Sequence, residues 1–197
     1  MVLKVISGIA RGRVLKTLPI NDLSIRPMLG RIKKSVFDII RSKIPRSVFI
    51  DLFAGVGSIG IEALSGGAKK VIFVELNNIS LSLIKHNVSM LGFDDRAKVI
   101  KCDIIKSFAT LQGKYDIIFM SPPYRDKNKN ILTFTYNILR DSVKYDILKG
   151  DSILITQRHI KESVGSVTGL ECFRSKKYGD TLVSFYKRCR DMGKYER

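Results

Sequence analysis

The segment that ends at Tyr124 combines hydrogen-bond acceptors with an aromatic ring, directly after an apolar run. It reads "IIFMSPPYRDK" over residues 117–127. The apolar run predicts a strand buried on both faces, and Pro122 and Pro123 end it because proline has no N–H for a sheet ladder. The Ser121 hydroxyl and the Pro122 carbonyl could accept the two N–H groups of an exocyclic base amine and direct its lone pair at an electrophile. Tyr124 offers a face on which the base could stack, a contact worth about 1–3 kcal/mol. The predicted catalytic residues are therefore Ser121, Pro122, Pro123 and Tyr124.

A glycine-rich turn earlier in the chain predicts a binding site for an adenosine-containing cofactor. In "DLFAGVGSIG", Gly55, Gly57 and Gly60 have G-x-G-x-x-G spacing, and Glu75 follows Gly55 by 20 residues. Glycines let the backbone approach a ligand at a helix N-terminus. A carboxylate at the end of the next strand accepts hydrogen bonds from a ribose diol. A purely structural glycine-rich turn is the alternative, and the position of Glu75 argues against it.

Two further carboxylates favour S-adenosylmethionine over a nicotinamide dinucleotide. Asp51 precedes the turn, where it would repel a pyrophosphate but suit the ammonium group of S-adenosylmethionine. Asp103 could accept from an adenine amino group while Ile104 lies against the ring, although an Asp before a helix is often only an N-cap. The predicted cofactor-binding residues are Asp51, Phe53, Gly55, Gly57, Glu75, Asp103 and Ile104.

The elements that must position these residues alternate between strand and helix patterns. Strands are predicted at 47–51, 70–75, 97–101, 115–120 and 151–157, and helices near 58–66, 79–91, 104–111 and 130–140. Two late runs, 170–178 and 181–188, predict a hairpin. The fold class is therefore α/β, with a doubly wound, mostly parallel sheet and an antiparallel hairpin at its end.

The first 46 residues carry much of the positive charge. They hold eleven Lys and Arg against two Asp, a surplus of nine out of a net +17 for the chain. A hairpin is predicted over 2–18, then a loop, and from Leu29 an amphipathic helix. Concentrated basic charge indicates a polyanionic partner, nucleic acid before an anionic membrane surface. We expect three segments: a basic extension (1–46), the main domain (47–188) and a polar tail (189–197).

Composition excludes several other classes of protein. The 197 residues are 45% hydrophobic, as in an ordinary globular domain, and no apolar run approaches the length of a membrane span. The three cysteines fit neither a disulfide framework nor a CxxC metal pair, and His86 and His159 lack partners at metal spacing. The start has no apolar signal-peptide core. We expect a cytoplasmic monomer without metal or membrane attachment.

The chain resembles the RsmD-type 16S rRNA (guanine-N2) methyltransferases over about residues 4–188. The motif after the fourth strand is similar to the [N/D/S]-P-P-[Y/F] of methyltransferases that act on base amines. "VISGIARGRVL" resembles the family's G-x-x-[RK]-G-[RK], and "IRPMLGRIKKSVFDII" its L-R-P-T segment. "DLFAGVGSIGIEALSGGAKKVIFVE" resembles its cofactor motif and "YGDTLVSFYKR" its last strands.

This resemblance implies a Rossmann-like class I methyltransferase fold with a seven-stranded sheet. It implies methyl transfer from S-adenosyl-L-methionine, leaving S-adenosyl-L-homocysteine, to the N2 amine of a guanine in 16S rRNA of the small ribosomal subunit or its assembly intermediate. It places the basic extension on the RNA, and the predicted RNA-binding residues are Arg11, Arg13, Arg26, Lys33 and Lys34.

The chain departs from the family pattern at three positions. Ser121 stands where the family usually has Asp, and Met28 and Lys34 replace its usual Thr and Glu. A hydroxyl is a weaker acceptor than a carboxylate, because charge-assisted hydrogen bonds are roughly twice as strong. Three alternatives stay open: an amino-methyltransferase for another RNA or DNA base, a nicotinamide-dependent oxidoreductase, and a non-catalytic rRNA-binding assembly factor.

Overall fold

The computed structural model describes residues 2–17 and 30–189. Its strands form one seven-stranded sheet of order β3-β2-β1-β4-β5-β7-β6, which confirms the mostly parallel sheet with an antiparallel end. The chain divides into two compact units, Met1–Ile104 and Ile105–Arg197. Each unit is described by itself below.

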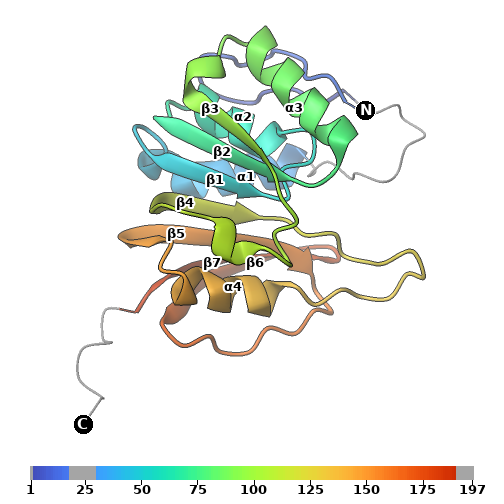
Figure 1. The fold of residues 1–197 in the computed structure, drawn as a ribbon, viewed down its shortest axis with the longest axis vertical. Coiled ribbons are helices and arrows are strands. Elements are labelled where there is room, and N and C mark those ends of the chain that lie inside the picture. Colours follow the sequence, from blue (N-terminus) through green and yellow to red (C-terminus); the bar gives the residue numbers. More distant parts are fainter. Residues whose placement is uncertain (1, 18–29, 190–197) are drawn as a thin grey trace. The chain divides into compact units, whose positions relative to one another are not determined.

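The first unit is built on three parallel strands and two connecting helices (Figure 1). The strands are β1 (Val48–Leu52), β2 (Lys70–Glu75) and β3 (Ala97–Lys101), and the helices are α2 (Ser58–Ser65) and α3 (Asn78–Met90). Helix α2 packs on β1 and β2, and α3 packs on β2 and β3. A Cβ on Gly60 would lie 2.2 Å from the Phe73 ring, so this glycine is required for the close approach of α2 to β2.

The N-terminal part of this unit contains one helix and an irregular segment. Helix α1 (Gly30–Ile40) buries Ile32, Val36 and Ile40 of the predicted apolar stripe, and a 3₁₀ turn at Arg41–Lys43 follows it. Leu29, the first residue of that stripe, lies outside the described residues. The hairpin predicted over 2–18 forms only in part within the described residues: an isolated antiparallel bridge joins Lys4 and Val14. Beside it, the Val5 N–H donates to the Arg13 carbonyl at 3.0 Å and the Leu15 N–H to the Leu3 carbonyl at 2.8 Å. Several backbone N–H groups of this segment bond to side chains of α2 instead of to a second strand.

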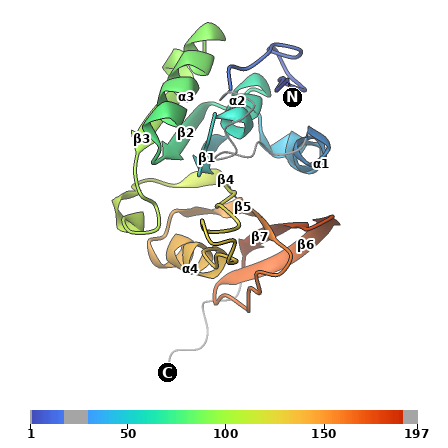
Figure 2. The ribbon, with the colours of Figure 1, turned by 90° about the vertical axis from the view of Figure 1, so that its right-hand side faces the viewer.

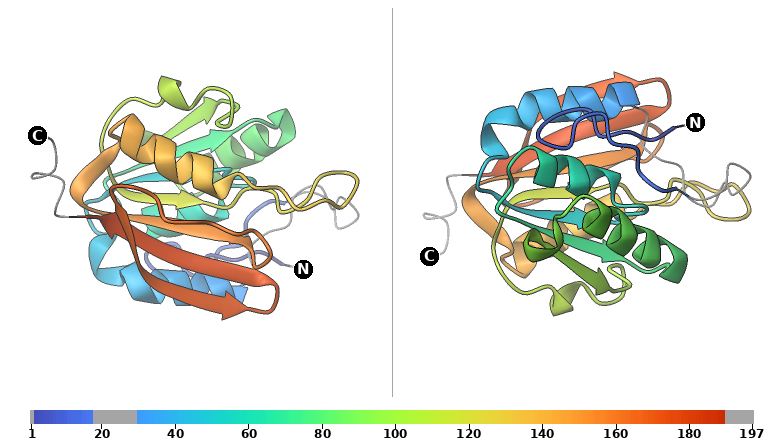
Figure 3. Two further views of the ribbon diagram at one scale, coloured as in Figure 1. Left: turned by 90° about the horizontal axis from the view of Figure 1, so that it is seen from below. Right: turned by 90° about the horizontal axis from the view of Figure 1, so that it is seen from above.

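The second unit consists of four strands and one helix (Figure 2). The strands are β4 (Tyr115–Met120), β5 (Leu148–His159), β6 (Leu170–Tyr178) and β7 (Thr181–Arg188). Strand β4 pairs in parallel with β5, and β7 is antiparallel to both β5 and β6. Helix α4 (Thr135–Lys144) packs on β5 and is drawn in orange above the red hairpin of β6 and β7 in the left panel of Figure 3.

The predicted boundaries are accurate for the strands and less so for two helices. The bounds predicted for β2, β3, β4, β6 and β7 are confirmed. The helix predicted near 104–111 is wrong, since only a 3₁₀ turn at Phe108–Thr110 forms. Helix α4 begins five residues later than predicted, because a turn precedes it.

Within the described residues, none of the helices has both the length and the apolar character that a membrane crossing requires.

Candidate functional site

The glycine turn of the first unit adopts a backbone conformation that brings its N–H groups to the end of β1. Phe53, Gly55 and Gly57 all have positive φ, at 66°, 56° and 83°. Gly57 is the N-cap of α2, and the Gly57 N–H donates to the Ala54 carbonyl at 2.8 Å. Glycine at 57 also fits the packing, since a Cβ there would come within 3.2 Å of Ile84.

Asp51 lies under this turn and is almost fully buried, with 1% of its surface exposed. One carboxyl oxygen accepts from the Gly60 N–H at 3.0 Å. Burial raises the pKa of the Asp51 carboxyl to about 8, the Gly60 N–H lowers it, and the negative charge of Glu75 adds a smaller rise. A buried carboxyl of this kind favours a cationic neighbour, because a nearby positive charge stabilises its ionised form.

Glu75 ends β2 with its carboxylate held in one orientation. One oxygen accepts from the Gly55 N–H at 2.7 Å, and the other from the N–H groups of Leu76 and Asn77 at 2.8 and 2.9 Å. These contacts join Glu75 to the glycine turn and leave one of its roughly four lone-pair sites for a further donor. A ribose hydroxyl is such a donor.

The end of β3 lies beside Glu75. The Cys102 N–H donates to the Glu75 carbonyl at 3.1 Å, and Asp103 and Ile104 follow directly. Asp103 is partly exposed, whereas Ile104 is buried. The first unit therefore gathers the predicted cofactor residues at the carboxyl ends of its three strands. These groups fit an adenosyl ligand with an ammonium group, since a buried acid, an oriented carboxylate and a glycine turn lie together.

In the second unit, the segment after β4 presents two acceptors that no described residue engages. Ser121 is partly exposed and Pro122 is buried. None of the described residues donates a hydrogen bond to the Ser121 hydroxyl or to the Pro122 carbonyl. Pro123 is exposed. The predicted pair of acceptors is thus present and unengaged.

Tyr124 is fixed by residues of β5 and β7. The Gln157 Nε2–H donates to the Tyr124 hydroxyl at 2.6 Å, and the hydroxyl lies 3.5 Å from Thr181 Oγ1. His159 meets the Tyr124 ring edge-on, with ring centroids 6.1 Å apart. Sequence reasoning missed these partners. The sequence did contain a signal for them, because the apolar strand β5 ends in polar residues. Gln157 and His159 are two residues apart in this strand and therefore share one face of the sheet.

A compact turn follows Tyr124 and projects cationic side chains. Asp126 organises it by accepting from the N–H groups of Asn128 and Asn130, both at 2.8 Å. The Asn130 side chain also donates to Asp126, and this hydrogen bond is the main reason that the pKa of Asp126 is lowered. The two backbone hydrogen bonds lower the pKa further. Lys127 and Lys129 are exposed on the turn. Sequence reasoning also missed this feature, although "YRDKNKN" carries the signal of alternating cations.

The N-terminal segment of the first unit is clamped to α2 by Glu62. This carboxylate is fully buried and accepts from the N–H groups of Ile6 and Ser7, at 3.0–3.1 and 2.7 Å, and from the Ser7 hydroxyl at 2.8 Å. Lys33 of α1 completes the cluster, with its Nζ 3.0 Å from Glu62 and 2.9 Å from the Lys4 carbonyl. The prediction that Lys33 contacts RNA is therefore wrong, because its side chain is only 1% exposed and neutralises a buried carboxylate.

The other predicted RNA contacts have different positions. Arg11 and Arg13 are exposed on either side of Gly12, whose φ of 86° makes the turn. Lys34 is exposed and pairs with Asp38 at 2.7 Å. Arg26 lies outside the described residues. No group of three metal-ligating side chains occurs within 2–17 and 30–189.

Comparisons with known proteins agree over nearly the whole chain. A family model described as Conserved hypothetical protein 95 matches residues 3–187. YlbH of Bacillus subtilis (strain 168), whose name marks it as a candidate rRNA methyltransferase, is 32% identical over 194 residues, which cover 94% of this chain and 99% of YlbH. Ribosomal RNA small subunit methyltransferase D of Haemophilus influenzae is 37% identical over 125 residues, 61% of this chain and 63% of that protein. The Escherichia coli (strain K12) protein of the same name is 26% identical over 189 residues, 94% of this chain and 90% of that protein.

Solved structures show the same architecture. The candidate methyltransferase yhhF of Escherichia coli has a TM-score of 0.77 at 25% identity, with 95% of this chain and 98% of that chain covered. SMU.776, a candidate methyltransferase complexed with SAH, has a TM-score of 0.61 at 16% identity, with 77% and 49% covered. The chain therefore has the class I S-adenosylmethionine-dependent methyltransferase fold, as the resemblance in sequence implied.

Proposed function

The chain belongs to the Conserved hypothetical protein 95 family, and on that premise we propose that it methylates the exocyclic N2 amine of a guanine in 16S rRNA. The names of the relatives from Haemophilus influenzae and Escherichia coli support small-subunit ribosomal RNA as the substrate class. S-adenosyl-L-methionine is the methyl donor, and no metal takes part.

Asp51 and Glu75 hold the two polar ends of the cofactor. Asp51 faces the ammonium group, which draws the buried carboxyl into its ionised form. Glu75 accepts from a ribose hydroxyl, and three backbone N–H groups already fix its orientation. Phe53, Gly55 and Gly57 line the backbone side of the ligand, and Asp103 and Ile104 contact the adenine.

Ser121 and Pro122 hold the amine of the target base. Their free oxygens take one N–H each, which pulls the nitrogen toward tetrahedral geometry and restores its lone pair. Pro123 restricts the backbone so that the Pro122 carbonyl keeps its direction. Tyr124 stacks on the flipped base, and Gln157 fixes its ring.

Bound S-adenosylmethionine supplies a methyl group already activated on a sulfonium. With the cofactor held by Asp51 and Glu75, Ser121 and Pro122 would aim the amine lone pair at this methyl group, the sulfur would keep the electron pair of the C–S bond, and the surplus proton would leave the nitrogen for water. Ser121 orients the amine. It does not act as a base, because a neutral serine hydroxyl is too weak a base for that role.

The pair of unengaged acceptors before Tyr124 carries this proposal. The test is transfer of a labelled methyl group to small-subunit particles and to naked 16S rRNA, followed by mapping of the modified nucleotide. We expect N2-methylguanine with the wild type and at least tenfold slower transfer with Tyr124→Ala at unchanged cofactor affinity.

Other outcomes separate the alternatives. Binding of rRNA without any transfer would identify an assembly factor that retains the fold, and methylation of a different base would reassign the substrate. Binding of a nicotinamide dinucleotide in preference to S-adenosylmethionine would refute the cofactor assignment. Loss of cofactor binding in Tyr124→Ala would give Tyr124 a structural role.

A further inference from the structure

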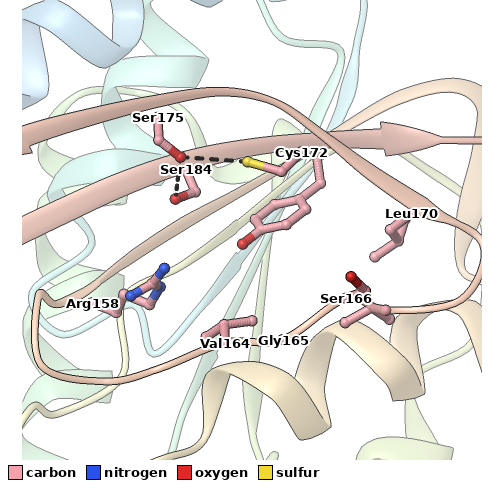
Figure 4. Close-up of a pocket in the computed structure, with 10 residues that line it drawn as sticks. Arg158, Val164, Gly165, Ser166, Leu170, Cys172, Ser175 and Ser184 are labelled. Carbon is pink, nitrogen blue, oxygen red and sulfur yellow. Dashed lines mark hydrogen bonds between the residues drawn. The ribbon is translucent and has the colours of Figure 1, made fainter.

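A cavity in the second unit is lined by a buried cation that no carboxylate of the described residues neutralises. It has a volume of about 260 Å³ and lies between β5, β6, β7 and the segment that precedes β6 (Figure 4). Arg158 of β5 lines it and is 8% exposed. Within the described residues, no Asp or Glu carboxylate oxygen lies within 4 Å of its guanidinium. A buried, unpaired charge is costly, so this site calls for an anion.

Within the described residues, part of the hydrogen-bonding capacity of Arg158 is unused, although its side chain also hydrogen bonds with Tyr186. Nη1 donates to the Glu162 carbonyl, while Nε is buried and has no partner within the described residues. Glu162 itself directs a carboxylate oxygen to the Thr135 N–H at 2.8 Å. Guanidinium offers five donors in a planar fork that matches the oxygens of an oxyanion.

Hydroxyl groups continue the polar lining from Arg158 along the hairpin. Ser175 and Ser184 are joined at 2.8 Å, and the Cys172 Sγ lies 3.4 Å from Ser175. Burial raises the pKa of the Tyr186 hydroxyl. Hydrogen bonds with Ser184 and Arg158 act in the opposite direction and lower this pKa. Every group of this lining can donate a hydrogen bond, and none carries a negative charge in its usual state.

The cavity is distinct from the residues around Tyr124. Strand β5 alternates, so Gln157 and His159 face Tyr124 while Arg158 points to the opposite face of the sheet. On β7, Ser184 and Tyr186 share that opposite face because Ser184 pairs with Thr156 and Tyr186 with Leu154. The polar groups therefore come from neighbouring strands and converge on one side.

We propose that this cavity binds a phosphate group, with Arg158 as its charge partner and Tyr186 and Ser184 as hydroxyl donors. A tetrahedral oxyanion uses donors from several directions, whereas a carboxylate offers only two coplanar oxygens. The volume equals roughly eight or nine water molecules, which leaves room for the group esterified to the phosphate. Val164, Val167 and Leu170 supply an apolar wall for that group. The phosphate belongs either to a free nucleotide or to an RNA strand.

The first experiment titrates the full-length protein with inorganic phosphate against sodium chloride at matched ionic strength, observed by the arginine Nε–H NMR signals and by thermal unfolding. We expect a saturable, phosphate-specific shift of the Arg158 signal. Arg158→Met should weaken the affinity at least about thirtyfold. Tyr186→Phe should weaken it about tenfold, since it removes one hydroxyl and keeps the ring. The matched control is Lys161→Gln, which removes an exposed cation three residues from Arg158 and should leave the affinity unchanged.

The absence of a phosphate-specific shift in the wild type would overturn the proposal, and so would equal affinity in Arg158→Met. If Arg158→Met does not fold, Tyr186→Phe decides, and an unchanged affinity in that variant refutes the site.

A second arm identifies the source of the phosphate. Guanosine 5′-monophosphate and a short single-stranded RNA are each added to the phosphate-loaded protein. Displacement by the RNA, with weaker RNA binding in Tyr186→Phe, assigns the site to an RNA phosphate. Displacement by the mononucleotide alone assigns it to a free nucleotide. The proposal uses no residue of the cofactor or base sites, so its failure leaves the proposed methyl transfer untouched.

Discussion

Lys33 and Glu62 form an ion pair at 3.0 Å with both side chains excluded from solvent. They connect α1 to α2, and Glu62 also holds the N-terminal segment through Ile6 and Ser7. One charge therefore fixes the segment that presents Arg11 and Arg13. Part of the positive charge of the first 46 residues therefore stabilises the fold and is not available to bind RNA.

Lys33→Met should lower the free energy of unfolding by about 3–5 kcal/mol, because it leaves the Glu62 carboxylate buried without its cation. Urea denaturation of the variant and the wild type measures the difference. Lys34→Met is the control at the next residue. Its pair with Asp38 is exposed and should be worth less than about 1 kcal/mol. Equal stability of Lys33→Met and the wild type would show that the ion pair does not stabilise the fold.

Binding of S-adenosylmethionine should release a proton from Asp51. The pKa of about 8 keeps this carboxyl mostly neutral at pH 7, and an ammonium group beside it favours the carboxylate. Calorimetric titrations in buffers of different ionisation enthalpy should therefore show release of roughly one proton. Asp51→Asn should bind more weakly and without this release. A buffer-independent enthalpy in the wild type would place the ammonium elsewhere.

Asp51 should also make the unliganded protein less stable as the pH rises. The folded state keeps a proton up to about pH 8, while an unfolded Asp loses it near its ordinary value of 3.8. The stability contribution is fully present below the unfolded pKa and is lost as the pH rises toward the folded pKa. Across pH 5–8, the wild type should lose up to about 1.4 kcal/mol per pH unit relative to Asp51→Asn. Parallel stability profiles for the two proteins would contradict the raised pKa.

The strands and the glycine turn were predictable because their signals are local. Buried parallel strands appear as short apolar runs, and Gly60 is required by a contact within one β-α-β unit. The positions of Asp51 and Glu75 were predictable for the same reason, because both residues lie at strand ends of this β-α-β unit. The strands and the glycine turn of the first unit therefore form where the sequence predicted them, whereas the hydrogen bond from the Gly55 N–H to Glu75 was not predicted.

The pairing of Lys33 could not be predicted, because it depends on which of many cations meets Glu62. A signal existed on the acidic side: Glu62 lies in a helix in which every residue is buried. On α1, Lys33 precedes the buried Phe37 by one helical turn, which places it on the inner face. The partners of Tyr124 are 33 to 57 residues away in sequence, so only the folded strands reveal them.

Ser121 should limit the rate of methyl transfer. Ser121→Asp would replace a neutral acceptor with a carboxylate, and charge-assisted hydrogen bonds are roughly twice as strong, so we expect about a tenfold higher kcat. Ser121→Ala should lower kcat about tenfold. Cofactor affinity should stay the same in both variants, and Ser82→Ala, at an exposed serine of α3, should match the wild type. A lower rate in Ser121→Asp would mean that the target amine needs a neutral partner.

Arg11 and Arg13 should contact RNA phosphates through the turn that Gly12 allows. Each phosphate contact on a single strand or duplex contributes about 0.7–0.9 to the slope of log K against log salt. Arg11→Gln/Arg13→Gln should therefore reduce that slope by about 1.4–1.8, measured by fluorescence anisotropy with a 16S rRNA fragment. Lys85→Gln/Lys98→Gln removes the same net charge from exposed positions on α3 and β3. If this control lowers the slope as much as the arginine pair does, the binding follows net charge alone and the N-terminal turn has no specific contact with the RNA.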